Sequence, residues 1–211
     1  MKNKMVRYVL IAAGTCFLLY HSVYFEKLSE VRAAEAAEYS FDPEAFARDF
    51  WSTALPAQLP EAVNLPELIS QLQAAPEQAF ADHSHALGIG NIRYFLVRGE
   101  GTVSAVSENR VTLQIDDQAV QLETEFVYGN AVRDAVGTID ISDFSNTMDL
   151  NRVSEEVNRI IRTEVIPPFR EEVQEGHEVA FAGALELNQK YLQLEEITII
   201  PVSLKTSSPN P

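Results

Sequence analysis

The sequence predicts an α+β protein: a small, partly open β-barrel of about five strands, preceded by helices and by one transmembrane segment. Three observations support this prediction. Residues 8–25 form an apolar run, helical periodicity dominates residues 41–83, and apolar residues alternate with polar ones over much of residues 92–202. With 46% hydrophobic and 22% charged residues, the 211-residue chain is able to form a packed core.

Residues 1–25 are predicted to be a signal anchor that crosses the cytoplasmic membrane once. Lys2, Lys4 and Arg7 flank the start of the apolar run, and Glu26 is the first acidic residue. A helix over the run extends about 27 Å, close to the hydrocarbon thickness of a bilayer. The positive-inside rule then places the following domain in the periplasm or outside the cell.

Two other fates of this segment remain open. His21 and Ser22 weaken the outer end of the apolar run, which leaves room for a cleaved signal peptide. Cys16, the only cysteine, follows small residues and is therefore a candidate for lipidation. Thr15 directly before it and the apolar residues 17–20 after it make lipidation the less favoured reading.

The remainder of the chain is strongly acidic. The net charge is -15, and all 31 acidic residues follow the apolar run, whereas 3 basic residues, Lys2, Lys4 and Arg7, lie before it. Such a surface repels the phosphates of nucleic acids, so no nucleic-acid partner is expected. The Ala/Glu-rich residues 26–40 are predicted to form a stalk between membrane and domain.

A helical segment is predicted over residues 41–90. Asp42 suits a helix N-cap, and the prolines at 56 and 60 are expected to end this first helix. A second helix is predicted over 65–74 and a short helix or turn over 76–83. The apolar face of the first helix comprises Phe41, Phe46, Phe50 and Trp51.

The barrel-like domain is predicted over residues 91–204, followed by a disordered tail over 205–211. Its expected strands are Ile92 to Val106 with an interruption near Gly99 and Gly101, 111–115, 119–127, 139–141, 178–187 and 191–202. A helix from Ser142 or Asp143 to about Thr163 is inserted before the last pair of strands. This order suits an OB-like barrel, with an open α+β sheet as the competing arrangement.

No arrangement of residues indicates catalysis. The sequence contains no Gly-x-Ser-x-Gly, and neither glycine pair, at residues 88–90 or 99–101, lies in a phosphate-binding loop. His83 and His85 could face one side of a strand but lack a clear third metal ligand. We therefore expect no enzyme activity, no metal and no cofactor.

One segment combines charge with apolar surroundings. Arg133 and Asp134 stand between Val132 and Ala135, and a charged pair is costly to bury unless its members are paired. The pair is expected either to lock its loop to the barrel or to orient a polar ligand. Asp143, Asn146 and Asn158 are candidates for the same ligand or for helix capping.

The same segment resembles a family of bacterial predicted periplasmic lipoproteins of unknown function. The resemblance rests on Gly129 to Ala135 (GNAVRDA), on Asp143 to Asn146 (DFSN), on Val153 and on Asn158, with Gly129, Ala135, Phe144 and Asn158 as structural signature residues. It extends to FLVRGEGTV at 95–103 and to other positions within 41–204. The resemblance implies an accessory role near sugar ABC transporters and carries over no catalytic residue.

The sequence thus predicts a membrane-anchored accessory or binding protein outside the cytoplasm. Its partner is expected to be a transporter component or a small polar ligand at Arg133, Asp134, Asp143 and Asn146. A structural or assembly protein that docks through the first helix is the second hypothesis. A hydrolase of envelope glycans is the third, and it requires two carboxylates in one cleft.

Overall fold

The computed structural model describes Val6, Tyr8, Phe17 and residues 41–207. Except for Val6, Tyr8 and Phe17, the predicted anchor at residues 1–25 lies outside the described residues, and so do Cys16 and the predicted stalk. Within the described residues, no helix is both long and apolar enough to cross a membrane. The chain divides into two units, Met1–Phe41 and Asp42–Pro211.

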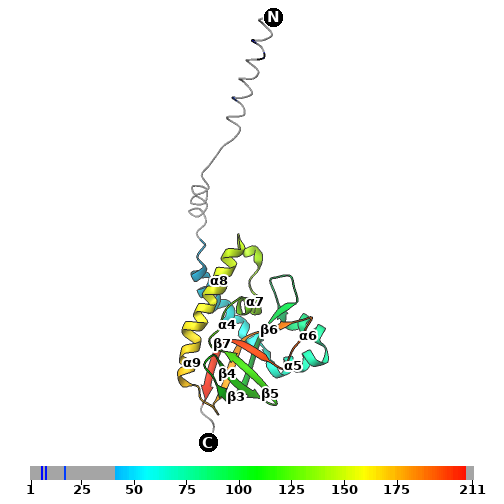
Figure 1. Ribbon diagram of the computed structural model, residues 1–211, viewed down its shortest axis with the longest axis vertical. Coiled ribbons are helices and arrows are strands. Elements are labelled where there is room, and N and C mark those ends of the chain that lie inside the picture. Colours follow the sequence, from blue (N-terminus) through cyan, green and yellow to red (C-terminus); the bar gives the residue numbers. More distant parts are fainter. Residues whose placement is uncertain (1–5, 7, 9–16, 18–40, 208–211) are drawn as a thin grey trace. The chain divides into compact units, whose positions relative to one another are not determined.

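The second unit is built around a closed barrel of five strands (Figure 1). These are β3 (Ile92–Val106), β4 (Arg110–Ile115), β5 (Gln118–Glu123), β6 (Glu178–Asn188) and β7 (Ile197–Ser207). Four antiparallel pairs, β3–β4, β4–β5, β3–β6 and β6–β7, and the parallel pair β5–β7 complete the ring. The five-stranded barrel is confirmed, whereas the expectation that it is partly open is wrong, because every barrel strand is paired on both sides.

The long strand β3 closes the ring because it is paired along both edges. One edge follows β6 from Ile92 to Thr102, and the other pairs with β2 (Ser84–His85), β1 (Val63–Asn64) and β4 in succession. Gly101 lies just before β4 begins to pair, and a Cβ there would be 2.7 Å from Ile115 Cγ1. Strand β3 continues through Gly99 and Gly101, so the predicted interruption near these glycines is wrong.

The first helix continues past Pro56 and ends near Pro60, so only the second of the two prolines that were expected to end it does so. Asp42 caps α3 (Pro43–Asp49) as expected, accepting a 3.0 Å hydrogen bond from Ala45 N. A π-helical turn over Phe50–Ala54 then leads into α4 (Leu55–Gln58) and a 3₁₀ turn (Leu59–Glu61). Pro56 has no N–H to donate, and the turn before it widens, with Leu55 N bonded to Phe50 O, instead of ending the helix.

The next helices agree with the sequence patterns. Helix α5 covers Leu65–Ala74, as predicted, and Asn64 caps it by accepting a hydrogen bond from Glu67 N. Helix α6 covers Pro76–His83, and Figure 1 shows both helices on one side of the barrel, opposite α8 and α9. Leu65, Leu68 and Leu72 of α5 are fully buried in the barrel core.

The segment between the two halves of the barrel differs from expectation at its boundaries. Helix α7 (Ala131–Val136) is followed by a 3₁₀ turn over Ile141–Asp143, where a strand was predicted at 139–141. Helix α8 (Thr147–Ile160) begins after Asn146 rather than at Ser142 or Asp143. A second π turn (Ile161–Val165) carries the chain into α9 (Ile166–Glu172) across the two prolines that were expected to break it.

Two strand ends were misplaced because side chains make turns there. The Glu123 carboxylate accepts hydrogen bonds from Glu125 N and Phe126 N, so β5 ends before the predicted residue 127. Asn188 likewise accepts from Tyr191 N, and β7 begins at Ile197 instead of residue 191. The strand then runs to Ser207, so the first residues of the predicted disordered tail at 205–211 pair with β6.

Candidate functional site

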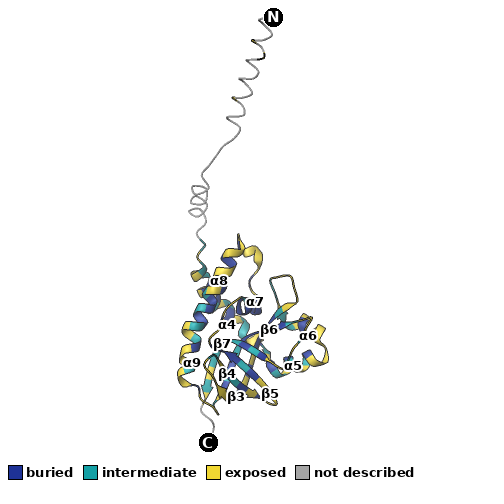
Figure 2. Cartoon of the chain, in the orientation of Figure 1, coloured by how far each residue is buried: buried dark blue, intermediate teal, exposed yellow. Residues whose placement is uncertain are grey.

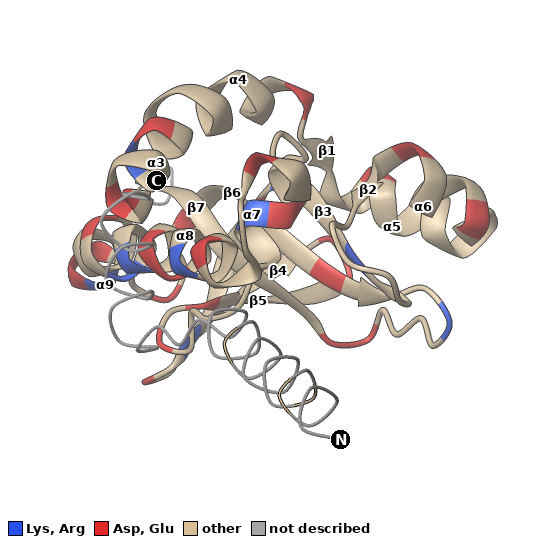
Figure 3. Cartoon of the chain, turned by 90° about the horizontal axis from the view of Figure 1, so that it is seen from above, with Lys and Arg blue, Asp and Glu red and all other residues tan. Residues whose placement is uncertain are grey.

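Arg133 and Asp134 lie side by side on α7, whose six residues are all buried (Figure 2), and appear as adjacent blue and red segments in Figure 3. Their side chains form an ion pair, with 2.6 Å between Arg133 Nη2 and Asp134 Oδ1 and 2.7 Å from Nε to the same oxygen. Arg133 Nη1 donates to Ser154 Oγ at 2.8 Å and to Leu150 O at 3.2 Å. Every guanidinium nitrogen therefore has a partner.

The other carboxylate oxygen of Asp134 continues the network. It accepts a 2.6 Å hydrogen bond from Asn130 Nδ2, and Asn130 Oδ1 accepts one of 3.2 Å from the Tyr94 hydroxyl. Burial, and then the nearby Glu186 carboxylate, raise the pKa of Tyr94, so its hydroxyl keeps its proton and remains a donor. We call Tyr94, Asn130, Arg133, Asp134 and Ser154 the α7 clamp.

The α7 clamp joins three parts of the fold: β3 through Tyr94, α7, and α8 through Ser154. Asn158 of α8 adds a 2.8 Å hydrogen bond to the carbonyl of Gly129. Arg133 is only 5% exposed, yet a hollow of about 420 Å³ lies beside it. The residues that line this hollow are Gly129, Asn130, Arg133, Asn151, Ser154 and Glu155.

The other two predicted site residues are engaged elsewhere. Asp143 is exposed and accepts a 3.0 Å hydrogen bond from Asp140 N within the 3₁₀ turn. Asn146 caps α8: it accepts from Asp149 N at 3.0 Å and donates to the Asp149 carboxylate at 2.7 Å. Over residues 41–207, neither side chain bonds to Arg133 or Asp134, so the four residues do not form one hydrogen-bonded site.

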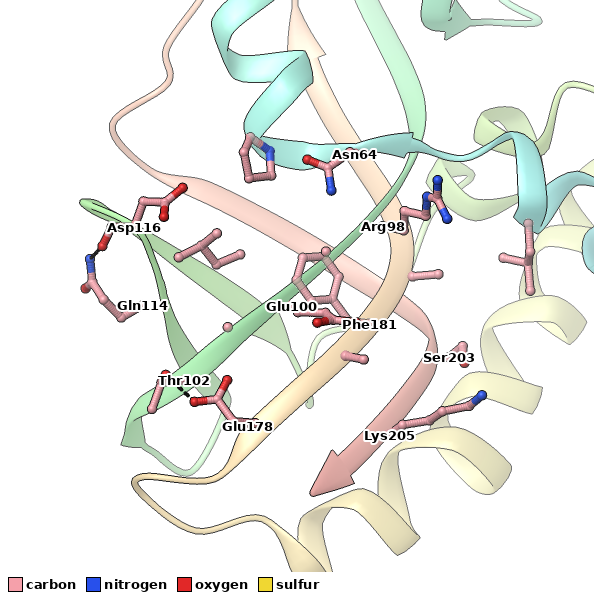
Figure 4. Close-up of a pocket in the computed structure, with 17 residues that line it drawn as sticks. Asn64, Arg98, Glu100, Thr102, Gln114, Asp116, Glu178, Phe181, Ser203 and Lys205 are labelled. Carbon is pink, nitrogen blue, oxygen red and sulfur yellow. Dashed lines mark hydrogen bonds between the residues drawn. The ribbon is translucent and has the colours of Figure 1, made fainter. Parts of the chain in front are cut away.

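A larger cavity, of about 830 Å³, lies on the outer face of the barrel (Figure 4). Its floor and walls come from the outward-facing side chains of β3, β6 and β7. We call this cavity the barrel groove and define it by Arg98, Glu100, Thr102, Glu178, Ala180, Ala182, Ser203 and Lys205. Leu59, Asn64, Pro66, Gly99, Gly101, Gln114, Ile115, Asp116 and Phe181 complete its lining.

The pairing register of β3, β6 and β7 determines which side chains lie opposite one another across the barrel groove. In one row, Arg98 pairs with Ala182, which pairs with Ser203. In the next row, Glu100 and Lys205 flank Ala180 in the same way. The two alanines form a low floor on β6, and longer polar side chains rise from β3 and β7 on either side.

The family was identified by comparison with known proteins. A family model described as "Predicted periplasmic lipoprotein (DUF2291)" matches residues 13–205. The chain belongs to this family. No curated protein matches the chain.

A solved structure supports the fold of this predicted periplasmic lipoprotein. A crystal structure described as an OB-fold protein from Thermotoga maritima superposes with a TM-score of 0.72 at 23% sequence identity. The match covers 80% of this chain and 100% of the other. It shows that the barrel is an OB fold, with α8 in the connection between β5 and β6.

The signature residues of the lipoprotein family have structural roles here. Gly129 adopts φ +81°, a left-handed conformation that suits glycine, and its carbonyl receives the Asn158 hydrogen bond. Ala135 is buried in α7, and Phe144 packs its ring 5.3 Å from that of Phe46. These four residues hold the α7 region in place.

The two histidines of residues 83–85 line one small pocket, but only His85 lies on a strand. His83 ends α6, and its Nε2 lies 2.7 Å from Gln71 Oε1. The ring of His85 packs against Gly137, where a Cβ would come within 2.6 Å of it. In the part of the chain that the structure describes, no three His, Cys, Asp or Glu side chains could together hold a metal ion.

Sequence reasoning missed the barrel groove. The signal was present in β3, where Arg98, Glu100 and Thr102 alternate with buried residues and therefore share one face. The opposing residues, Ala182 and Lys205, lie some 80 to 110 positions later, and only the pairing register brings them together.

Proposed function

We propose that this protein is an accessory protein of the cell envelope, held at a membrane by its N-terminal segment, whose OB barrel binds a small polar ligand. Membership of a predicted periplasmic lipoprotein family supports the location. The barrel groove supports the binding role, and it is the observation on which this role depends. Its hydrogen-bonding side chains surround a floor of two alanines, a shape that receives a small molecule.

A role as a glycan hydrolase is less well supported. Glu100 and Glu178 both line the barrel groove, so two carboxylates do share one cleft. A glycosidase, however, keeps one carboxyl protonated in an apolar pocket, and these two side chains are exposed. Glu178 is also engaged, accepting a 2.6 Å hydrogen bond from Thr102 Oγ1.

A docking role for the first helix is likewise less well supported. Phe50 is 3% exposed, and Phe46 packs its ring on Phe144 of the same chain. Most of this apolar face is therefore used inside the domain, which leaves little of it for a partner. We retain a component of a sugar transporter as the proposed partner, with cross-linking in intact membranes as its test.

The proposed binding site is tested by filling the groove. Ala182→Phe places a large side chain on the floor of the barrel groove, and Ala119→Phe places the same side chain on an exposed site of β5 outside it. Melting temperatures of the full chain in detergent are measured with neutral sugars, sugar acids and sugar phosphates. We expect a ligand to raise the melting temperature of the wild type and of Ala119→Phe but not of Ala182→Phe.

The proposed attachment is tested with alkaline phosphatase, which is active only outside the cytoplasm, fused after Pro211. We expect an active fusion in the membrane fraction. Labelling with radioactive palmitate distinguishes the two kinds of attachment: a lipid anchor at Cys16 is labelled in the wild type but not in Cys16→Ser, whereas a membrane-spanning helix that carries no lipid is labelled in neither. An inactive fusion would contradict the proposed location.

A further inference from the structure

We propose that the barrel groove recognises an anionic group, a carboxylate or a phosphate, on its polar ligand, and that Arg98 and Lys205 bind this group. The inference rests on the proposed function and specifies its ligand class. It is based on the charges in the groove, on the strand register and on the acidic residue between the two cations.

Arg98 and Lys205 differ from the other cationic side chains of residues 41–207. Within the part of the chain that the structure describes, neither makes an ion pair, a side-chain hydrogen bond or a ring contact. All the others have a partner, namely Arg48, Arg110, Arg133, Arg152, Arg159 and Arg162 with carboxylates, Arg93 and Arg170 with backbone carbonyls, and Lys190 with the Tyr191 ring.

This pairing pattern is informative because the chain is acidic. With 31 acidic and 16 basic residues, a cation readily finds a carboxylate. The two side chains that remain unpaired both line the same cavity. Their positive charge is therefore available to an anion that enters from solvent.

The strand register places the two cations within reach of one ligand. Arg98 lies on β3 and Lys205 on β7, the two strands that flank β6. The two residues lie in neighbouring rows of paired residues. With strands about 4.8 Å apart and rows about 6.8 Å apart, their Cα atoms are separated by about 12 Å. Figure 4 shows Ser203 between them, so its hydroxyl is placed to donate to the same anion.

Glu100 restricts which anions fit. It shares the row of Lys205 and carries no ion-pair partner among the described residues, and together with Glu178 and Asp116, which also line the groove, it repels a second negative group. Its oxygens instead accept hydrogen bonds from hydroxyl groups. The barrel groove is therefore suited to a molecule with one anionic group and neighbouring hydroxyls, and it disfavours polyanions.

Three related probes test the inference: D-glucuronate for a carboxylate, D-glucose 6-phosphate for a phosphate, and D-glucose as the neutral control. Each is titrated into the isotope-labelled full chain in detergent, and backbone amide shifts are followed by NMR. We expect shifts at residues 98–102, 178–182 and 203–205 with at least one anionic probe and none, or much weaker ones, with glucose. The stronger anionic probe identifies the group.

Variants show whether the two cations are responsible. Arg98→Gln and Lys205→Gln should each weaken the binding of the anionic probe about fivefold, as for an exposed ion pair, and the double variant should abolish it. Lys190→Gln removes the same charge outside the groove and should bind as the wild type does. Binding should also weaken at high salt.

Three outcomes overturn the inference and are distinguishable from a failure of the proposed function. If glucose binds as well as the anions, and Ala182→Phe blocks it while Arg98→Gln does not, the groove is a ligand site without anion recognition. If none of the probes shifts the groove amides, or the shifts persist in the double variant, Arg98 and Lys205 do not bind an anion. The proposed function itself fails if no ligand depends on Ala182.

Discussion

Arg133 carries its charge into the interior at a high energetic cost, which the α7 clamp offsets. Its partners are one carboxylate, one hydroxyl and one backbone carbonyl, so no polar atom of the guanidinium is left without a hydrogen bond. Such a pair contributes less to stability than its short distances suggest, because both ions lose their hydration. Removing only one partner is a different matter, since the other charge then stays buried alone.

Arg133→Ala should therefore destabilise the protein by about 3–5 kcal/mol, because the buried Asp134 carboxylate loses its counter-ion. The measurement is urea unfolding of the full chain, followed by circular dichroism. Arg48→Ala is the matched control: Arg48 pairs with Glu164 at 2.6 Å, but both side chains are 45% exposed. This change should cost at most about 1 kcal/mol.

Ligand binding decides between the two readings of Arg133. If Arg133→Ala lowers the stability but leaves ligand binding unchanged at a temperature below the melting temperature of the variant, Arg133 serves the fold alone. A small stability loss with abolished binding would instead assign the hollow beside Arg133 as the ligand site and contradict the barrel groove.

The sequence was informative about individual residues when their partners were close by. The pairing of Arg133 with Asp134 is an adjacent pair and was predicted. The bonds to Ser154 and from Asn130 to Tyr94 span 21 and 36 positions, and no local pattern indicates them. The same holds for Lys205, whose place beside Arg98 depends on the register of three strands.

Among the elements, the two π turns explain why proline signals were misread. Both precede prolines, at Pro56 and at Pro167, and in both the helix widens and goes on. A proline removes one hydrogen bond, and a wider turn shifts the remaining bonds past the gap. The local sequence patterns located the helices correctly. They could not show that each helix continues past its proline by way of a π turn.

Gly183, the single glycine of β6, has less room for a Cβ than any other glycine of the barrel strands. It lies where the pairing of β6 with β7 shifts by one residue, and a Cβ there would collide with the carbonyl oxygen of Ile200. Gly183→Ala should destabilise the protein by about 1–3 kcal/mol, because backbone has to move. The measurement is the midpoint of denaturant unfolding.

Gly88→Ala provides the comparison. A Cβ at Gly88 would meet nothing within 4 Å, so this substitution should leave the unfolding midpoint almost unchanged. Equal destabilisation at the two positions would mean that collision with β7 does not determine the result, because the reduced flexibility of the unfolded chain alone would stabilise the fold.

The whole molecule combines a domain with a complete core and an N-terminal segment of different character. Every core residue of the described chain lies at or after Ala47. The order of strands and the inserted helix were predictable from alternation and periodicity. Closure of the ring was not, because it depends on the parallel pairing of β5 with β7 and on the double pairing of β3.

A fragment of residues 41–211 should consequently fold by itself. We expect a soluble monomer that unfolds in one cooperative transition, at a melting temperature within about 2–4 °C of the full chain in detergent, the shift that about 1 kcal/mol produces in a domain of this size. Calorimetry checks this. A broad transition without a heat-absorption peak would show that the N-terminal segment contributes to the folded core.

The position of β7 also determines when the domain can fold. This strand lies between β5 and β6, and it follows all the other strands in the part of the chain that the structure describes. Until residues 197–207 have emerged, both neighbours have an open edge and the ring has a gap. A nascent chain with this strand order keeps an open ring until β7 has been made, and export of a still unfolded chain to the periplasm would require such a delay.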